Sequence, residues 1–439
     1  MTETEPTVRP GQDATGAASG DRTERGKRAT LHSSGMREAI PAGGLREYWY
    51  PLIPDSDVPR GKPVKRTVLG VDLALFRGKS GEVKAVVDAC PHRGASMSGG
   101  SSHWRGTITC PYHGWTFDEG GNCLAVLGEG PESRIPGMES ANIATYPTRT
   151  LKGLVFVWMG RRDPAPIEED VPEQFFRDDA LVQVTERIWN CNWRPAVENL
   201  LDAHVYYVHR NSVQLLLLPA RNLIGMTKMG PRRPRPAVIN GRALSYSSGE
   251  LSFLDDFVGM THPGQLHGNG SGDAAARPQL KTNFQDTYPL LGGAKWPKTK
   301  ARLYFGQVVE KVKGTYKRPP VASISDEWQD FHLPTTYQVD YPDHIYSRVT
   351  VPITEEQSRI FYFHTTTPPS RRDRVFDTWF WRLWYRWQMV DNFSAQDGKV
   401  VQAQRYDLPE KLSATDTFPL AMRRFILEYG RDFQDEGTG

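Results

Sequence analysis

The sequence predicts an α+β protein: a small all-β domain, then a larger α+β domain whose antiparallel sheet is flanked by helices. Three observations lead to this prediction. Short runs of β-branched and aromatic residues, punctuated by Gly and Pro, extend from residue 46 to about 160. Two later runs, 344–351 and 358–367, have the composition of strands. The stretch from 374 to about 403 has the pattern of one long helix.

The chain divides into three parts. Residues 1–36 contain few large apolar residues and no apolar segment of the kind found in secretory signals, so we expect a disordered tail. Residues 37–160 form the predicted β domain. A connector rich in Pro and acidic residues then opens the second domain, residues 161–439. Within that domain, 193–209 is predicted to be helical, and 219–300 is rich in Pro and Gly.

Composition excludes several classes of function. The 439 residues are 38% hydrophobic and 24% charged, which is typical of a globular protein. The net charge of +3 argues against nucleic-acid binding, and no apolar run is long enough to span a bilayer. With only four Cys, a disulfide framework is not expected, and we place the protein in the cytoplasm.

Two short loops each combine one Cys with one His. The first is Cys90-Pro-His92-Arg-Gly. The second is Cys110-Pro-Tyr-His113-Gly, and seventeen residues separate His92 from Cys110. Zinc fingers usually pair Cys with Cys and His with His. One Cys and one His per loop suits a two-iron cluster, with both thiolates on one iron and both imidazoles on the other. A zinc site and two coincidental turns are the alternatives.

A second metal site is suggested by Glu198-Asn-Leu-Leu-Asp-Ala-His204-Val-Tyr-Tyr-Val-His209. Two imidazoles and one carboxylate leave open positions on an iron for dioxygen. Asp397, expected in a polar turn after the long helix, is the best candidate for the carboxylate, and Asp391 is the second choice. On a regular helix positions 204 and 209 lie about 140° apart, so a bulge or helix end is required. Two ordinary core histidines are the alternative.

At these residues the chain resembles the Rieske non-haem iron aromatic-ring-hydroxylating oxygenases, in their large terminal-oxygenase subunit. The stretch 192–199 most resembles the branch that acts on carbazole-like and oxoquinoline-like rings. The resemblance implies a [2Fe-2S] cluster bound by Cys90, His92, Cys110 and His113. It also implies a mononuclear iron(II) on His204, His209 and Asp397. Asp202 would link this iron to the cluster of a neighbouring subunit, although the family usually has two residues between this Asp and the first His.

The same resemblance implies the reaction and its partners. The protein would use O2, with electrons from a ferredoxin or an NAD(P)H-dependent reductase, to hydroxylate, dihydroxylate or dealkylate an apolar aromatic or heterocyclic substrate. A homotrimer is expected, and Asn199 would hydrogen-bond near the iron. A Rieske electron carrier without oxygenase activity is the main alternative, and a zinc-binding interaction module is the other.

Several further segments have less specific interpretations. Apolar runs at 215–219, 224–226 and 361–363 are candidate pocket walls, although core packing is the commoner role of such runs. The Trp- and Arg-rich run 379–387 is interpreted as a helix packed on the catalytic domain, with its Arg side chains reaching water. His103 is expected at the surface and Cys123 in the core. Arg93 and Arg105 are proposed to receive an acidic ferredoxin.

Overall fold

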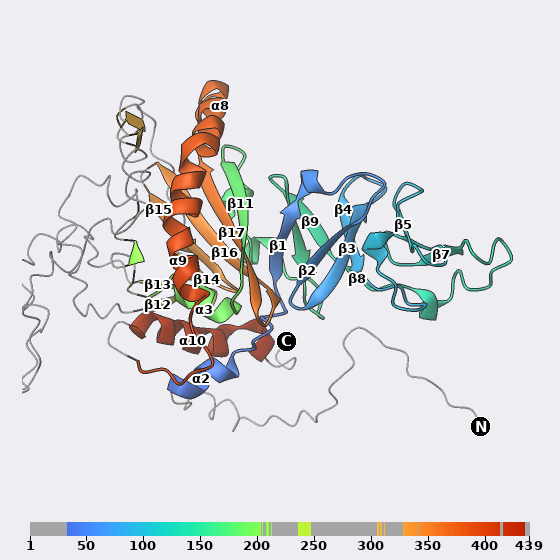
Figure 1. Ribbon diagram of the computed structural model, residues 1–439, viewed down its shortest axis with the longest axis horizontal. Coiled ribbons are helices and arrows are strands. Elements are labelled where there is room, and N and C mark those ends of the chain that lie inside the picture. Colours follow the sequence, from blue (N-terminus) through green and yellow to red (C-terminus); the bar gives the residue numbers. More distant parts are fainter. Residues whose placement is uncertain are drawn as a thin grey trace, which may run out of the picture.

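The structure is a computed structural model of the chain. It describes residues 33–202, 204, 208–209, 212, 236–246, 305–306, 308–309, 311, 328–341, 343–412 and 416–434. A lobe of short strands lies beside a larger lobe in which helices cover a sheet (Figure 1). The fold class expected from the sequence is therefore confirmed, with an all-β unit followed by an α+β unit.

The expected N-terminal tail lies almost wholly outside the described residues. Its last four residues do not fit the expectation of disorder, because Ser33–Ala39 form helix α2. Met36 and Ile40 are buried in the main hydrophobic core. Burial of these apolar side chains stabilises α2 against the rest of the protein.

The first lobe contains three small antiparallel sheets, ordered β1-β10-β9, β2-β3-β4-β8 and β5-β6-β7. The first Cys/His loop follows β4 of the second sheet, and the second loop joins β5 to β6 of the third. The strands are β1 (Trp49–Pro54), β2 (Val64–Val68), β3 (Val71–Arg77), β4 (Val83–Val87), β5 (Thr107–Thr109), β6 (Trp115–Asp118), β7 (Cys123–Val126), β8 (Thr145–Tyr146), β9 (Thr148–Leu151) and β10 (Leu154–Trp158).

The second lobe is built on a seven-stranded antiparallel sheet of order β11-β17-β16-β15-β14-β13-β12. The strand-like runs predicted near 344 and 358 are β16 and β17, the two longest strands of this sheet, which lie side by side in its interior. The strands are β11 (Leu181–Trp189), β12 (Pro236–Ile239), β13 (Ala243–Tyr246), β14 (Asp330–His332), β15 (Thr336–Tyr341), β16 (His344–Thr354) and β17 (Gln357–Thr366). Arg348 pairs with Tyr362 across β16 and β17, so both side chains point to the same face.

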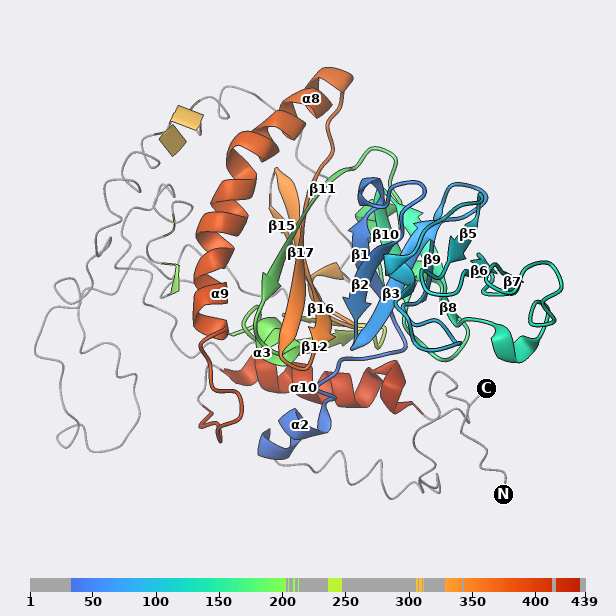
Figure 2. The same ribbon diagram turned by 45° about the vertical axis from the view of Figure 1, so that its right-hand side comes forward.

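One long helical segment covers that face (Figure 2). It begins as α8 (Arg371–Phe380), continues through the π-helical stretches Trp381–Tyr385 and Trp387–Ser394, and ends as α9 (Ala395–Val401). This confirms the predicted long helix, and it explains the Trp-rich run. Trp381, Trp384 and Tyr385 pack into a core cluster, whereas the intervening Arg382 and Arg386 are exposed. No helix within the described ranges is both long and apolar enough to cross a membrane.

Two shorter helices lie at the end of the sheet. Helix α10 (Thr417–Tyr429) passes beneath it (Figure 1). Helix α3 (Trp193–Glu198) begins where the Asn192 side chain accepts a hydrogen bond from the amide of Arg194. The prediction of a helix over 193–209 was too long, because α3 ends at Glu198. Among the described residues that follow, 199–201, 204 and 209 lie in turns, Asp202 in a bend, and Val208 is helical.

Candidate metal centres

The two Cys/His loops have the same local construction. In each loop the Cys amide donates to the carbonyl five residues later, Cys90 to Ala95 at 2.8 Å and Cys110 to Trp115 at 2.7 Å. In each, the Gly four residues after the Cys returns a hydrogen bond to the Cys carbonyl. These glycines, Gly94 and Gly114, have φ of +68° and +72°. Only glycine adopts that backbone conformation without strain, so the sequence Cys-x-x-x-Gly fixes both turns.

The first loop is fastened by a carboxylate next to it. Asp88 is buried and accepts hydrogen bonds from the hydroxyls of Ser96 and Ser98 and from the amide of Ser98, the last at 2.6 Å. These bonds tie the residue just before the loop to the residues just after it. The positions of the loop residues are therefore set by neighbours only a few positions away in the sequence.

The four Cys and His side chains of the two loops differ in solvent exposure. Cys90 and Cys110 are buried, whereas His92 is exposed and His113 half-buried. The imidazole rings lie 4.6 Å apart between centroids, and His92 stacks on Trp115. Burial is the main reason that the pKa of the Cys90 thiol is raised to about 12. A thiolate at this position therefore requires a bound cation.

The donor atoms fit two metal positions rather than one. In the described part of the chain, only one group of three or more Cys, His, Asp or Glu donors lies within 4.8 Å of one another, and it is not this group. A single zinc ion would require all four donors to converge. The side-by-side thiols and side-by-side imidazoles suit a two-iron cluster.

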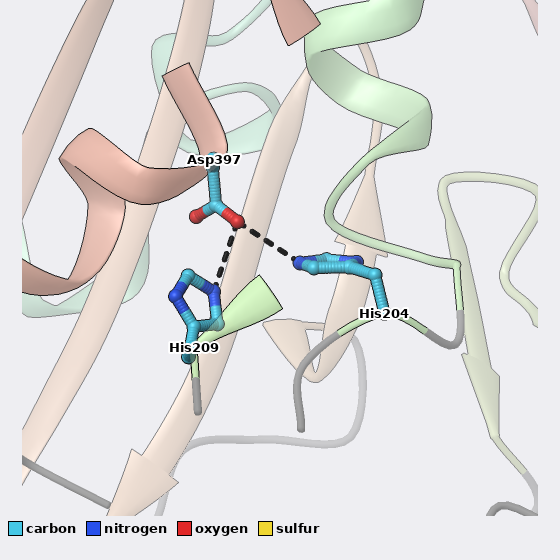
Figure 3. A group of neighbouring side chains, drawn as sticks. All are labelled: His204, His209 and Asp397. Atoms are coloured by element: carbon cyan, nitrogen blue, oxygen red, sulfur yellow. Dashed lines mark hydrogen bonds and ion pairs between the residues drawn. The ribbon is translucent and has the colours of Figure 1, made fainter. Parts of the chain in front are cut away.

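The group that does converge is His204, His209 and Asp397, shown in Figure 3. Oδ1 of Asp397 lies 3.0 Å from Nε2 of His204 and 2.9 Å from Nε2 of His209. Both Asp397 and His209 are buried. The second contact lacks hydrogen-bond geometry, and neither ring nitrogen of His209 has a hydrogen bond. Two imidazole nitrogens that converge on one carboxylate oxygen bring the donor atoms of a metal site together, and two imidazoles with one carboxylate suit iron(II).

Electrostatics within this group are dominated by the carboxylates. Burial alone would raise the pKa of Asp397, but the contacts with His204 and His209 outweigh it and hold that pKa well below its usual range. Burial likewise opposes protonation of His204, yet Asp202 and Asp397 together raise its pKa to about 10. The buried Asp397 is therefore an anion, and the site attracts a cation.

Distant parts of the chain assemble the triad. Helix α3 ends before either histidine, and one imidazole nitrogen of each reaches Oδ1 of Asp397. His204 follows α3, and the amide of Val208 donates to its carbonyl at 3.0 Å. Glu198, the last residue of α3, forms a buried ion pair with Arg423 of α10, whose Nη2 also donates to Glu410. This network fixes the end of α3 from which His204 departs.

Asp397 was expected in a polar turn after the long helix, and that expectation was wrong. The residue lies in α9 and is buried. Helix α9 packs against the sheet because the next residue is glycine: a Cβ on Gly398 would lie 2.8 Å from the Trp189 ring. The second-choice ligand, Asp391, is elsewhere, in an ion pair with Arg187.

Two residues near the triad were predicted from the sequence. The Asp202 carboxylate contacts Nδ1 of His204, on the ring edge opposite Asp397, so the short Asp-Ala-His spacing still brings Asp202 to the histidine. Its side chain is 36% exposed and hence accessible to another subunit. Asn199 is buried, and its Nδ2 lies 3.4 Å from Nε2 of His204.

The remaining predicted residues have mixed outcomes. His103 is exposed and Cys123 is buried, as expected. Among the candidate pocket walls, 215–219 and 224–226 lie outside the described residues. Phe361 and Phe363 pack in the main core, and only Tyr362 faces the helix, where its hydroxyl is 2.8 Å from that of Ser394.

One buried residue beside the triad was missed in the sequence. Arg348 lies in the middle of β16 and is fully buried, with Nη1 4.0 Å from Oδ2 of Asp397. The only signal was a lone Arg in a run with the composition of a buried strand. A single charged residue of that kind does not say which residue it accompanies.

Comparison with known proteins gives two family matches. Residues 48–147 match the Rieske [2Fe-2S] domain, and residues 158–219 match the homotrimeric ring hydroxylase family. Residues across nearly the whole chain align with the terminal oxygenase component of carbazole 1,9a-dioxygenase from Metapseudomonas resinovorans, with 27% identity over 90% of this chain and 93% of that one.

Two further relatives extend the comparison. The oxygenase component of dicamba O-demethylase from Stenotrophomonas maltophilia is 34% identical over 39% of this chain and 49% of its own length. The solved structure of a reduced complex between oxygenase and ferredoxin in carbazole 1,9a-dioxygenase has the same fold. Its TM-score is 0.62 at 19% identity, covering 94% of this chain and 99% of that one. The chain thus combines a Rieske [2Fe-2S] domain with a homotrimeric ring-hydroxylase domain, and over nearly its whole length it is similar to the terminal oxygenase component of a Rieske oxygenase.

Proposed function

We propose that this protein hydroxylates or oxidatively dealkylates an apolar aromatic or heterocyclic compound, with O2 as the oxidant and electrons delivered by a ferredoxin or reductase. One observation carries the proposal: a buried His/His/Asp group with converging donor atoms, in a chain that also carries a Rieske domain. The relatives named above act, by their names, on carbazole and dicamba, which are both aromatic.

We assign electron entry to residues 37–160 and catalysis to residues 161–439. In this assignment Cys90, His92, Cys110 and His113 hold the [2Fe-2S] cluster, and His204, His209 and Asp397 hold the mononuclear iron(II). The cluster would supply single electrons, and the mononuclear iron would supply positions for dioxygen. Residues in the catalytic domain bind and orient the substrate and keep water out.

The walls around the triad support an apolar substrate. Phe393 stacks on the ring of His209 at 3.6 Å between centroids. Tyr362 is buried on the same side of the sheet, and burial raises the pKa of its hydroxyl, so it stays neutral. Aromatic side chains next to the metal-binding group favour ring-shaped apolar ligands.

Asp202 is assigned the link between subunits. It contacts Nδ1 of His204 and is partly exposed, so its other carboxylate oxygen is accessible to an imidazole from the first domain of a neighbouring chain. The match to a homotrimeric family supports a trimer. In such a trimer, electrons from the cluster of one chain reach the triad of the next.

The redox partner is assigned to the cluster end of the first domain. Arg93 and Arg105 are both exposed there and would attract an acidic ferredoxin. The related oxygenase whose structure is a complex with ferredoxin supports this class of partner. The four cysteines form no disulfide, which favours a cytoplasmic location for the reaction.

The proposal is tested by counting metals and measuring oxygen consumption. Anaerobically purified protein is expected to hold about three irons and two acid-labile sulfides per chain. Addition of NADH, reductase, ferredoxin and an aromatic substrate should then give product with an oxygen atom from ¹⁸O2. About two irons, with no substrate-dependent oxygen uptake after iron(II) is added back, would identify an electron carrier instead.

A mixing experiment tests the assignment of electron transfer between chains. Cys90→Ser removes a cluster ligand and Asp397→Ala removes a triad ligand, so trimers of either variant alone should be inactive. Co-expressed chains form mixed trimers in which an intact cluster can face an intact triad. Recovered turnover in the mixture is the expected result, and its absence would place electron transfer within one chain.

A further inference from the structure

Arg348 is a buried cation beside the triad. Burial of a charge is costly unless the charge is paired, so its partners indicate its role. Its side chain is fully buried in the middle of β16. The guanidinium lies 4.4 Å from the centre of the Trp189 ring, and Nη2 donates to the carbonyl of Ala196 at 2.9 Å. Trp189 in turn rests against Gly398, next to Asp397. The plane and reach of the guanidinium are therefore set by residues from three elements: β11, α3 and α9.

The other terminal nitrogen, Nη1, faces two groups of the site at once, while Nε has no hydrogen-bond partner. Nη1 is 3.5 Å from Oδ1 of Asn199 and 4.0 Å from Oδ2 of Asp397. A guanidinium has only donors, so the groups that face it must present acceptor oxygens rather than N–H groups. Oδ1 of Asn199 does so at the limit of hydrogen-bond distance, and Oδ2 of Asp397 does so as a charge contact.

This requirement fixes the orientation of the Asn199 amide. The oxygen faces Arg348, so the NH2 group faces the other way, toward Nε2 of His204 at 3.4 Å. Asn199 therefore offers N–H donors to the space between the triad residues. An amide nitrogen does not bind a metal, whereas an amide oxygen can.

The same requirement gives the two carboxylate oxygens of Asp397 different neighbours. Oδ1 lies within 3.0 Å of both histidine nitrogens, and Oδ2 is the oxygen nearer to Arg348. A carboxylate free of such a partner can bind a metal through both oxygens. With Oδ2 on the side of Arg348, only Oδ1 points to the position where the donor atoms converge.

We propose that Arg348 is a positioning residue that keeps coordination positions open: it turns the Asn199 oxygen away from the metal and limits Asp397 to one metal-binding oxygen. The inference rests on the metal site of the proposed function. It predicts that loss of Arg348 adds protein oxygens to the metal and removes a neighbouring positive charge. Both changes should tighten metal binding while reducing the number of bound waters.

The test uses Mn(II) alone, added to protein from which the mononuclear metal has been removed and whose cluster is kept oxidised and therefore diamagnetic. Free Mn(II) is measured by its electron paramagnetic resonance signal, and bound waters by water-proton relaxation. In Arg348→Met, Mn(II) should bind at least about tenfold more tightly, with fewer exchangeable waters. Arg348→Lys keeps a charged donor, so its affinity and water count should return toward those of the unchanged protein.

Arg359→Met is the matched control. Arg359 is also a buried arginine of the paired strands β16 and β17, but it faces Glu186 rather than the triad. This variant should bind Mn(II) as the unchanged protein does. The cluster absorption spectrum reports folding in every variant.

Two results would overturn the inference. One is Mn(II) binding in Arg348→Met with unchanged affinity and waters. The other is weaker binding with more waters, the result expected if Arg348 only supports the packing. If the unchanged protein bound no stoichiometric Mn(II), or bound it equally well after Asp397→Ala, the metal site itself would be refuted, and this inference with it.

Discussion

The two metal centres differ in how far the chain must fold before each exists. In the first lobe all four ligands lie within 24 residues, 90–113, on two loops of the same construction. In the second, His204 and Asp397 are 193 positions apart and meet only when α9 packs on the sheet. The first centre is therefore a local structure, and the second is a product of the tertiary fold. A substitution far from the metals should therefore reduce metal binding at the second centre more than at the first.

The largest effect expected is loss of one metal without loss of the other. Asp397→Ala should reduce iron from about three to about two atoms per chain and bring turnover to background, with the Rieske-type spectrum unchanged. Iron, sulfide and visible absorption are measured on the same sample. Simultaneous loss of the cluster would show that the two centres do not form independently. It would contradict the conclusion that the first centre is a local structure.

The next effect concerns the charged network that fixes the end of α3. Arg423→Met removes the cationic partner of Glu198, whose side chain is only 12% exposed, and leaves it the Tyr406 hydroxyl alone, which should cost about 3 kcal/mol of unfolding free energy. Urea unfolding and retained iron are the measurements, and mononuclear iron should be lost before the cluster. Arg405→Met is the control, because the Arg405–Asp407 pair is 70% and 62% exposed and should contribute little. Equal losses in both variants would contradict the role of the network.

A smaller effect is expected from one methyl group at the contact between α9 and the sheet. In Gly398→Ala the added Cβ would lie 2.8–3.0 Å from atoms of the Trp189 ring. Relief of that overlap should cost about 1–3 kcal/mol and shift α9, which carries Asp397. Mn(II) affinity and urea unfolding are the readouts. Gly94→Ala offers the comparison in the first lobe: a Cβ there meets no atom, and only backbone strain at its positive φ opposes the change.

The smallest effect is a difference in acid sensitivity between the lobes. Burial lowers the pKa of His332, in β14, to about 3 from its ordinary 6.5. Between these values the unfolded chain binds a proton that the folded chain does not, so stability falls as the pH falls through this window. From pH 7.5 to 5.5, His332→Gln should lose about 1.4 kcal/mol less stability than the unchanged protein. His103→Gln, at an exposed site of the first lobe, should change this dependence little.

The same contrast explains what the sequence could predict. The cluster loops are recognisable because ligands, turn glycines and the fastening Asp88 are neighbours along the chain. His204 and His209 could be proposed as ligands from their residue types, and Asp397 from its place after a long helix. Their environment could not be predicted: the early end of α3 depends on its packing, and the burial of Asp397 depends on the contact between Gly398 and Trp189. Arg348 was missed because its partners come from three separate elements.

The π-helical stretches above α9 have a consequence for the angle at which Asp397 is presented. A π-type turn holds one more residue than an α-type turn, so Trp381–Tyr385 and Trp387–Ser394 accommodate extra residues as the chain descends along the sheet. Each residue of an ordinary helix rotates the next side chain by about 100°. The rotational phase of the last turn is therefore set by the number of residues counted from Arg371 downward. Removing one residue from this stretch would turn the Asp397 carboxylate away from the histidines, although every side chain of the site would still be present.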